Sequence, residues 1–234
     1  MACTRSGSPA TPSDALALEL PFPPLVESWE RRDHPSQVRL RSYREAVRAL
    51  AEPALAVLEP PLALGFHVAG RPDIASGCDL DNFLTPVVSA LGGGDAFSFV
   101  WATRGQPNEP ASLSLLRATD AHLKMVGRLS HVSTRLSVSP DRKEWKMQLA
   151  SAVGQHDVAR RTGPIELAIR FGVSPQRSWV TLWKPAIDAL GGVLGEGDRP
   201  WHPRDDRISL LVLERELRPD LGWDVELDIT WALQ

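Results

Sequence analysis

Three acidic residues in the first half of the chain have the types and the spacing that metal-assisted hydrolysis needs. Asp79 and Asp81 stand two positions apart in Asp-Leu-Asp-Asn, and Asp95 follows the next predicted helix and turn. In extended chain the side chains of Asp79 and Asp81 point the same way, because the strand period is two. Two or three convergent carboxylates suffice for Mg²⁺ or Mn²⁺, which can activate water for phosphodiester hydrolysis.

A structural role competes for the same residues. Asp81 or Asn82 could serve only as a helix N-cap that accepts hydrogen bonds from backbone N–H groups. Against this, three carboxylates packed without a cation repel one another and raise one another's pKa, which favours a bound metal. Proline fits the first turn of a helix, so Pro86 predicts a helix that begins near Thr85, with the acids in extended chain before it.

The segment that holds these acids occurs twice. Residues 79–93 (DLDNFLTPVVSALGG) align without a gap with residues 178–192 (SWVTLWKPAIDALGG), at an offset of 99 positions. The matches include Pro86 with Pro185 and the closing Ala-Leu-Gly-Gly of each copy. This pattern indicates an internal duplication.

The flanking segments agree with a duplication. Helical spacing of apolar residues predicts helices at 42–55 and 142–153. Alternation of apolar residues predicts strands at 61–70, 95–103, 111–118, 164–173, 206–214 and 223–233. Both halves therefore have the order helix, strand, helix, strand, strand. We expect an α/β (α+β) protein of two tandem units, each a small mixed sheet with helices, packed as a pseudo-dimer about a pseudo-twofold axis.

The expected organisation has four parts. They are a disordered tail at 1–15, a first unit at 16–118, a linker at 119–130 and a second unit at 131–234. Cys3 lies in the tail and Cys78 is the only other cysteine, so a structural disulfide is not expected. We therefore expect a cytoplasmic location. No signal pattern and no bilayer-length apolar run is found, so no membrane contact is expected.

The net charge of −3 argues mildly against a nucleic-acid partner, but the charges are unevenly distributed. Residues 117–177 carry eleven Lys or Arg against five Asp or Glu, whereas residues 185–234 carry five against eleven. Such asymmetry can create a basic face. The candidate phosphate-contacting residues are Arg135, Arg142, Lys143, Lys146, Arg160 and Arg161. A solvated helix face is the equal alternative.

Two other features have structural interpretations that we favour. Trp179, Trp183 and Trp201 could stack on unpaired bases, but tryptophans more often fill an interface between repeats. The Gly92-Gly93-Gly94 run follows a helix, and no Gly-Lys-Ser/Thr follows it, so we interpret it as a helix end and turn, not as a phosphate loop.

The first half resembles the RusA-type Holliday junction resolvases, which are small homodimeric α/β endonucleases. The resemblance rests on an apolar segment that ends in Leu-Pro-Phe-Pro-Pro (20–24), on the helix that opens Tyr-Arg-Glu (43–45), and on Cys-Asp-Leu-Asp-Asn (78–82). It covers roughly residues 16–118 and, more weakly, 131–233.

The resemblance implies a magnesium site in the first half. The two acids of the family's D-x-D motif match Asp79 and Asp81, and its third acid, which follows the next helix, matches Asp95. A lysine one turn after the D-x-D motif is also functional in the family, and Thr85 stands at that position here.

The second half looks like a degenerate copy. Ser178 and Val180 stand where the D-x-D acids should be, whereas Lys184 stands at the position of the family's lysine. The pair Asp205 and Asp206 stands at the third-acid segment. Lys184 or Asp206 could therefore complete the site of the first half across the interface between the units.

These features predict a metal-dependent, structure-specific DNA endonuclease that acts on Holliday junctions or other branched DNA in recombination and repair. One intact site per chain predicts nicking by a nucleoid-associated monomer, unless two chains associate. The first alternative is a catalytically inactive resolvase-like protein that binds branched DNA or a protein partner. The second is an interaction scaffold without a DNA role, which the pI of about 6.1 favours.

Overall fold

The computed structural model describes residues 15–28, 30–70, 79–107, 109–154, 156 and 162–234. Residues 1–14 of the tail predicted at 1–15, both cysteines and the candidate DNA contacts Arg160 and Arg161 lie outside the described residues.

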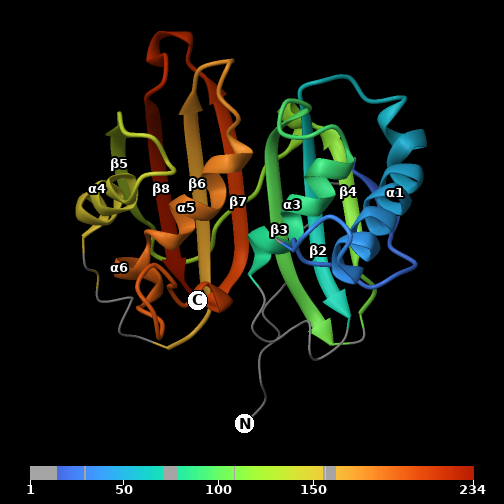
Figure 1. The fold of residues 1–234 in the computed structure, drawn as a ribbon, viewed down its shortest axis with the longest axis horizontal. Coiled ribbons are helices and arrows are strands. Elements are labelled where there is room, and N and C mark those ends of the chain that lie inside the picture. The colour runs from blue at the N-terminus through green and yellow to red at the C-terminus, as the bar shows by residue number, and fades with distance from the viewer. Residues whose placement is uncertain (1–14, 29, 71–78, 108, 155, 157–161) are drawn as a thin grey trace.

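One mixed sheet of eight strands runs through the described part of the chain (Figure 1). Its strands are β1 (Leu16–Glu19), β2 (Leu62–Gly70), β3 (Phe97–Pro107), β4 (Ser112–Arg117), β5 (Ser130–Leu136), β6 (Ile165–Val173), β7 (Ile208–Leu217) and β8 (Val225–Leu233). Their order in the sheet is β1-β4-β2-β3-β7-β6-β8-β5. The predicted α/β (α+β) class is confirmed.

The pairing of the strands is symmetric about the central pair β3–β7. In the first half β2 is parallel to β3 and antiparallel to β4, which is antiparallel to β1. In the second half β6 is parallel to β7 and antiparallel to β8, which is antiparallel to β5. The two central strands pair antiparallel, with Phe99 opposite Glu214. This symmetry supports the predicted duplication, while pseudo-dimer packing stays a prediction.

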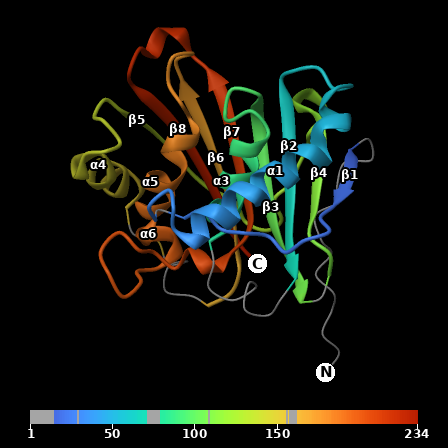
Figure 2. The same cartoon turned by 45° about the vertical axis from the view of Figure 1, so that its right-hand side comes forward.

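The helices lie on one face of this sheet (Figures 1 and 2). They are α1 (Pro35–Leu55), α3 (Leu80–Ala90), α4 (Lys143–Val153), α5 (Trp183–Asp188) and α6 (Gly191–Leu194). The main core fills the space between helices and sheet, and it includes Val47 of α1, Leu84 of α3, Trp183 of α5 and the strand residues Phe66 and Leu167. Burial of these side chains is the main stabilising contribution.

The opposite face of the sheet carries a smaller apolar cluster. Ala63, Trp101, Leu210 and Val212 form it, and residues of segment 118–123 pack against it. Part of the predicted linker therefore covers the second face of the sheet. The backbone N–H of Val126 extends this contact, because it donates to the buried carboxylate of Glu166 at 2.6 Å.

The strands and helices predicted from periodicity are present, with ends displaced by a few residues. The strands β1 and β5 are additional to the periodic order, and α1 begins at Pro35, before the predicted start. The helix start near Thr85 was predicted wrongly, since α3 begins at Leu80 and holds Pro86 in its interior.

A contact from a distant segment explains how α3 tolerates its proline. Pro86 has no N–H to donate to the carbonyl oxygen of Asn82, one turn earlier. The backbone N–H of Glu27 donates to that oxygen instead, at 2.9 Å. The acids before Pro86 therefore lie at the start of a helix and not in extended chain.

None of the helices in the described part of the chain combines the length and the apolar character that crossing a membrane requires.

Candidate metal centre

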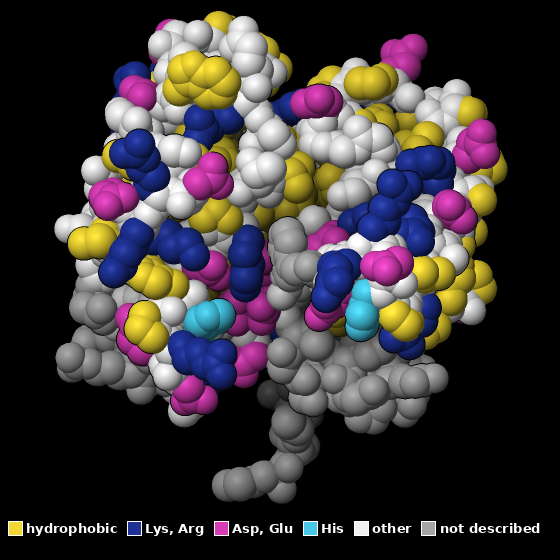
Figure 3. All heavy atoms as spheres, viewed as in Figure 1, with side chains coloured by type: hydrophobic (Ala, Val, Ile, Leu, Met, Phe, Trp, Pro, Cys, Tyr) yellow, Lys and Arg dark blue, Asp and Glu magenta, His cyan; other side chains and the backbone are white. Residues whose placement is uncertain are grey.

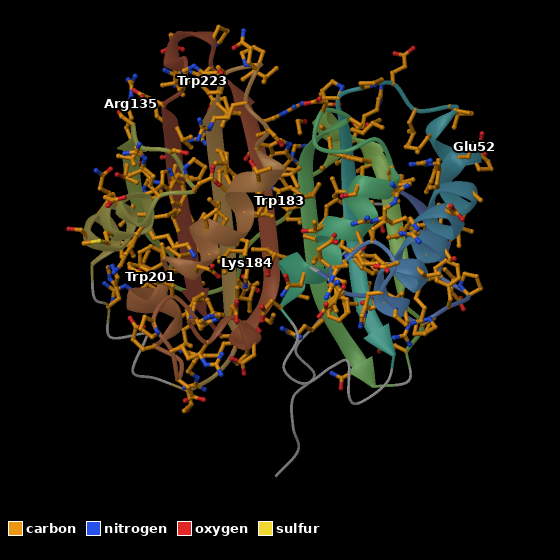
Figure 4. The ribbon with its side chains drawn as sticks, in the orientation of Figure 1. Glu52, Arg135, Trp183, Lys184, Trp201 and Trp223 are labelled. Carbon is orange, nitrogen blue, oxygen red and sulfur yellow. The ribbon has the colours of Figure 1, made fainter. Side chains whose placement is uncertain are left out.

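The start of α3 in the first half meets α5 of the second half at the boundary between the halves. Lys184 of α5 lies at this junction (Figure 4). Its Nζ atom is 3.0 Å from Oδ2 of Asp79, 3.2 Å from Oδ2 of Asp205, 3.2 Å from Oδ1 of Asp188 and 4.0 Å from Oδ2 of Asp81. Four carboxylates, two from each half, therefore surround one ammonium group.

Three of these acids can share a metal ion. Asp79, Asp81 and Asp205 each offer a carboxylate oxygen, and these oxygens lie within 4.8 Å of one another. An all-oxygen set of this kind suits Mg²⁺ or Mn²⁺, and zinc and other softer ions usually take nitrogen or sulfur ligands. The predicted cofactor thus has a site whose donors fit it.

Asp81 gives a separate indication that a cation belongs here. The residue is only 3% exposed, and Lys184 at 4.0 Å is its one ion-pair partner among the described residues. A buried carboxylate is costly unless it is paired or coordinates a metal, so Asp81 is the acid that a divalent ion would satisfy most.

The local electrostatics follow from burial. Burial raises the pKa of Asp81 to about 6, with Lys184 opposing this and Asp79 adding to it. Burial and a hydrogen bond with Asp79 raise the pKa of Asp205 to about 7, again against the effect of Lys184. Burial alone would lower the pKa of Lys184, but the surrounding carboxylates raise it above its usual range. Lys184 is therefore a permanent cation.

The positions of Asp79 and Asp81 follow from the start of α3. Asp79 occupies the N-cap position with extended backbone and makes no capping hydrogen bond through its side chain. Its Oδ2 atom accepts a hydrogen bond of 2.9 Å from the side-chain amide of Asn82. Asp81 lies in the first helical turn. Asp79 and Asp81 converge as predicted, although they do so at the start of a helix and not in extended chain. The N-cap position is taken by Asp79, so the alternative role of Asp81 or Asn82 as N-cap is wrong.

Asp95 is not part of the group, which corrects its prediction as the third ligand. Its side chain is 93% exposed and its Oδ1 atom lies 3.4 Å from Nη1 of Arg215. The turn after α3 has positive φ angles at Gly92 and Gly93. Asp205, 8% exposed on a 3-10 turn before β7, takes the place of Asp95, whereas the neighbouring Asp206 is exposed.

Asp188 extends the group toward α4 and was missed by the sequence analysis. Its Oδ1 atom faces Lys184, and its Oδ2 atom lies 2.7 Å from Nζ of Lys146. The two lysines thus hold Asp188 between them. Asp188 follows Lys184 by four residues, a spacing that places two side chains on one helix face and could have revealed the pair.

The contacts of the other described basic residues that were predicted do not involve the four carboxylates around Lys184. Arg135 pairs with Asp224 at 2.8 Å and Glu226 at 3.9 Å, and Arg142 and Lys143 are exposed near the start of α4. Figure 3 shows Lys and Arg side chains over α4 and over α1, on either side of acidic side chains between them. Basic side chains therefore lie over both halves on this face of the molecule.

Trp179 makes another contact across the boundary. Its indole Nε1 donates to the carbonyl oxygen of Gly94 at 2.8 Å. Trp179 is fully buried and meets Trp183 edge to face, with ring centroids 4.9 Å apart. The structural interpretation of these two tryptophans holds, whereas Trp201 is only partly buried.

No protein-family model and no curated protein matches the sequence. One solved structure with some likeness is a cyanuric acid hydrolase, described as an evolutionary innovation by structural concatenation. It is 13% identical, and the alignment covers 79% of this chain and 64% of that one, with a TM-score of 0.23. The chain therefore spans less than two thirds of that protein's length, and such a low TM-score carries no argument about fold or activity.

Proposed function

We propose that this protein is a divalent-metal-dependent endonuclease that nicks branched DNA through a single centre made by both halves. The observation that carries the proposal is the convergence of Asp79 and Asp81 with Asp205, within 4.8 Å, beside Lys184. The resemblance of the first half to junction resolvases supports the choice of substrate.

Each residue has a defined task in this proposal. Asp79, Asp81 and Asp205 hold the ion, which supplies an activated water and neutralises charge on the phosphorus oxygens when bound. Lys184 moves from among the carboxylates toward Asp188, where its ammonium group can contact a phosphate oxygen. With all four acids and the two lysines ionised, the formal charge of the group is −2, which one divalent ion balances.

The single centre explains the proposed nicking. Ser178 and Val180 stand where a second D-x-D pair would be, so the second half has no equivalent acids. Basic side chains over α1 and α4 could contact the DNA arms on either side of the centre (Figure 3). The proposed setting is the cytoplasm, in contact with the nucleoid.

The test is a cleavage assay on four-way junctions, flaps and forks with Mg²⁺ or Mn²⁺. We expect Asp79→Asn, Asp81→Asn and Asp205→Asn each to lose at least about 100-fold in rate, since each removes a ligand of the only ion. Asp95→Asn is the matched control and should keep its rate. Equal loss in Asp95→Asn, or full activity in Asp205→Asn, would contradict the proposal.

One observation favours a second candidate, an inactive protein that binds branched DNA. The ammonium of Lys184 already lies within 4.0 Å of all four carboxylates, so it can neutralise them without a metal. In that case Mn²⁺ would not bind, no substrate would be cut, and junction binding would still weaken steeply with salt. Mn²⁺ titration by calorimetry separates the two candidates.

A further inference from the structure

A cavity of about 200 Å³ lies beside the metal centre, on the side of the second half. Trp201, Glu196 and Asp188 line it, and Gly191 and Gly192 form part of its surface. Asp188 belongs to both places, because its Oδ1 atom is 3.2 Å from Nζ of Lys184. A ligand in the cavity would therefore be separated from the acids of the metal centre by the side chain of Asp188.

Trp201 has an unusual backbone for a residue with a large side chain. Its φ angle of 61° makes it the one non-glycine residue with positive φ in the described part of the chain. Bulky residues rarely adopt this conformation, and such strain is often found at functional sites. Trp201 is partly exposed and lines the cavity, so part of its surface is open to a ligand (Figure 4).

The remaining walls offer hydrogen-bond acceptors. The carboxylate of Glu196 lies against Gly191, where a Cβ atom would come within 2.4 Å of Oε1. Glycine at this position thus leaves the space that Glu196 uses. Among the described residues, neither lysine nor arginine lines the cavity, and the polar side chains that do are the acceptors Asp188 and Glu196. A flat ligand with N–H donors complements an aromatic side chain and two carboxylates.

We propose that this cavity holds one unstacked nucleobase of the strand that is cut, with its ring on Trp201 and its exocyclic amino group toward Asp188 and Glu196. The choice of a nucleic-acid ligand rests on the proposed function. Adenine, cytosine and guanine carry such an amino group and thymine does not, so the site discriminates against thymine next to the cut. Lys146 and Lys184 balance the charge of Asp188, which eases the approach of a polyanion.

The direct test uses the full chain and a short single-stranded oligonucleotide that carries 2-aminopurine, a fluorescent purine with an amino group. Stacking on Trp201 should quench this probe, without need for metal or cleavage. We expect Trp201→Ala to abolish the quenching and to weaken binding about tenfold. Trp201→Phe should keep most of both, and Trp223→Phe is the control, since Trp223 is 72% exposed at another site.

A second measurement tests the amino-group contact. Substrates that differ only in the base beside the cut should be cut fastest with an amino-bearing base and several-fold more slowly with thymine. Glu196→Gln should reduce this difference, because the amide offers one acceptor oxygen in place of a carboxylate.

The two proposals fail in different ways. Unchanged quenching and binding in a folded Trp201→Ala, or a base preference that Glu196→Gln does not alter, overturns the base site while metal-dependent cleavage stands. Quenching that depends on Trp201, without Mn²⁺ binding or cleavage, supports the base site and overturns the endonuclease. The fold of each variant is checked by its thermal unfolding.

Discussion

The Nζ atom of Lys184 lies 3.0 Å from Oδ2 of Asp79, although 105 residues separate them in the chain. Each half supplies what the other lacks. The first half has Thr85 where the resemblance expects a lysine, and the second has Ser178 and Val180 where it expects acids. One group of acids around a lysine is therefore assembled from residues of both halves.

Replacement of Lys184 by Met should make the protein depend on metal. Without its ammonium group, the nearby carboxylates repel one another in a partly buried place. We expect a loss of about 1–3 kcal/mol in unfolding free energy at pH 8. The loss is smaller than for a fully buried ion pair, because the Lys184 side chain is 36% exposed and solvent screens its charge. Mn²⁺ should restore more stability to this variant than to the wild type. Urea unfolding with and without Mn²⁺ measures this, with Lys143→Met as the exposed control.

The metal-free protein should be more stable at pH 5 than at pH 8. Burial raises the pKa of Asp81 to about 6 and that of Asp205 to about 7, so the folded state keeps protons that the unfolded chain has released. Stability therefore falls as pH rises through these values. Between pH 5 and pH 8, Asp81 alone accounts for on the order of 1 kcal/mol of this fall.

Asp81→Asn tests this pH dependence, because an amide does not titrate. Thermal unfolding from pH 5 to 8 should show a smaller decline in this variant, while Asp206→Asn, at an exposed neighbour of the group, behaves as wild type. A decline of the same size in Asp81→Asn would show that other groups cause it.

Asp188→Asn should separate positioning from metal binding. Asp188 contacts both Lys184 and Lys146 but is not one of the three acids whose oxygens lie within 4.8 Å of one another. We expect the rate of cleavage to fall roughly tenfold, because Lys184 loses the partner that orients it. The affinity for Mn²⁺, measured by calorimetry, should stay within about twofold. A loss of Mn²⁺ affinity as large as that in Asp81→Asn would make Asp188 a ligand.

Gly94→Ala should disturb the contact between the halves. A Cβ atom at Gly94 would lie 2.5 Å from Cγ2 of Val180 and 2.9 Å from Nε1 of Trp179. Overpacking of this kind costs about 1–3 kcal/mol. Gly93→Asn is the control, because Gly93 has open space around it and asparagine tolerates its positive φ. Chemical denaturation should show the larger loss at Gly94.

Cleavage of a symmetric four-way junction should stop at one nick per binding event. A chain with one centre has no second set of acids for the opposite strand. With junction in excess over protein, singly nicked product should accumulate in proportion to protein. Coupled cuts on both strands at the earliest times would show that two chains act together.

The sequence predicts more of the fold than of the site. Apolar alternation and helical spacing are local properties, so they predict strands such as β2 and helices such as α4 closely. The start of α3 was misplaced because the backbone N–H of Glu27, far away in the sequence, satisfies the carbonyl oxygen that Pro86 leaves free. The residues close to Pro86 in the sequence therefore give no sign of this contact.

Only part of the site was predicted, because the rest of it also depends on contacts between residues that are distant in the sequence. Asp79 and Asp81 converge because they share one helix start, and Lys184 was suggested by its place in the second copy. The third acid depends on how β3 pairs with β7, which brings Asp205 of the second half to the acids of the first. The sequence pattern of the first half alone predicts Asp95 as the third acid instead.

The pairing of β3 with β7 has a consequence for how the protein works at low abundance. An enzyme whose centre is shared between two separate subunits loses it when the subunits come apart on dilution. Here both contributors are joined covalently and by the hydrogen bonds of one sheet. The group of acids around Lys184 therefore exists in every single molecule, and the proposed activity per molecule would not depend on how many copies a cell contains.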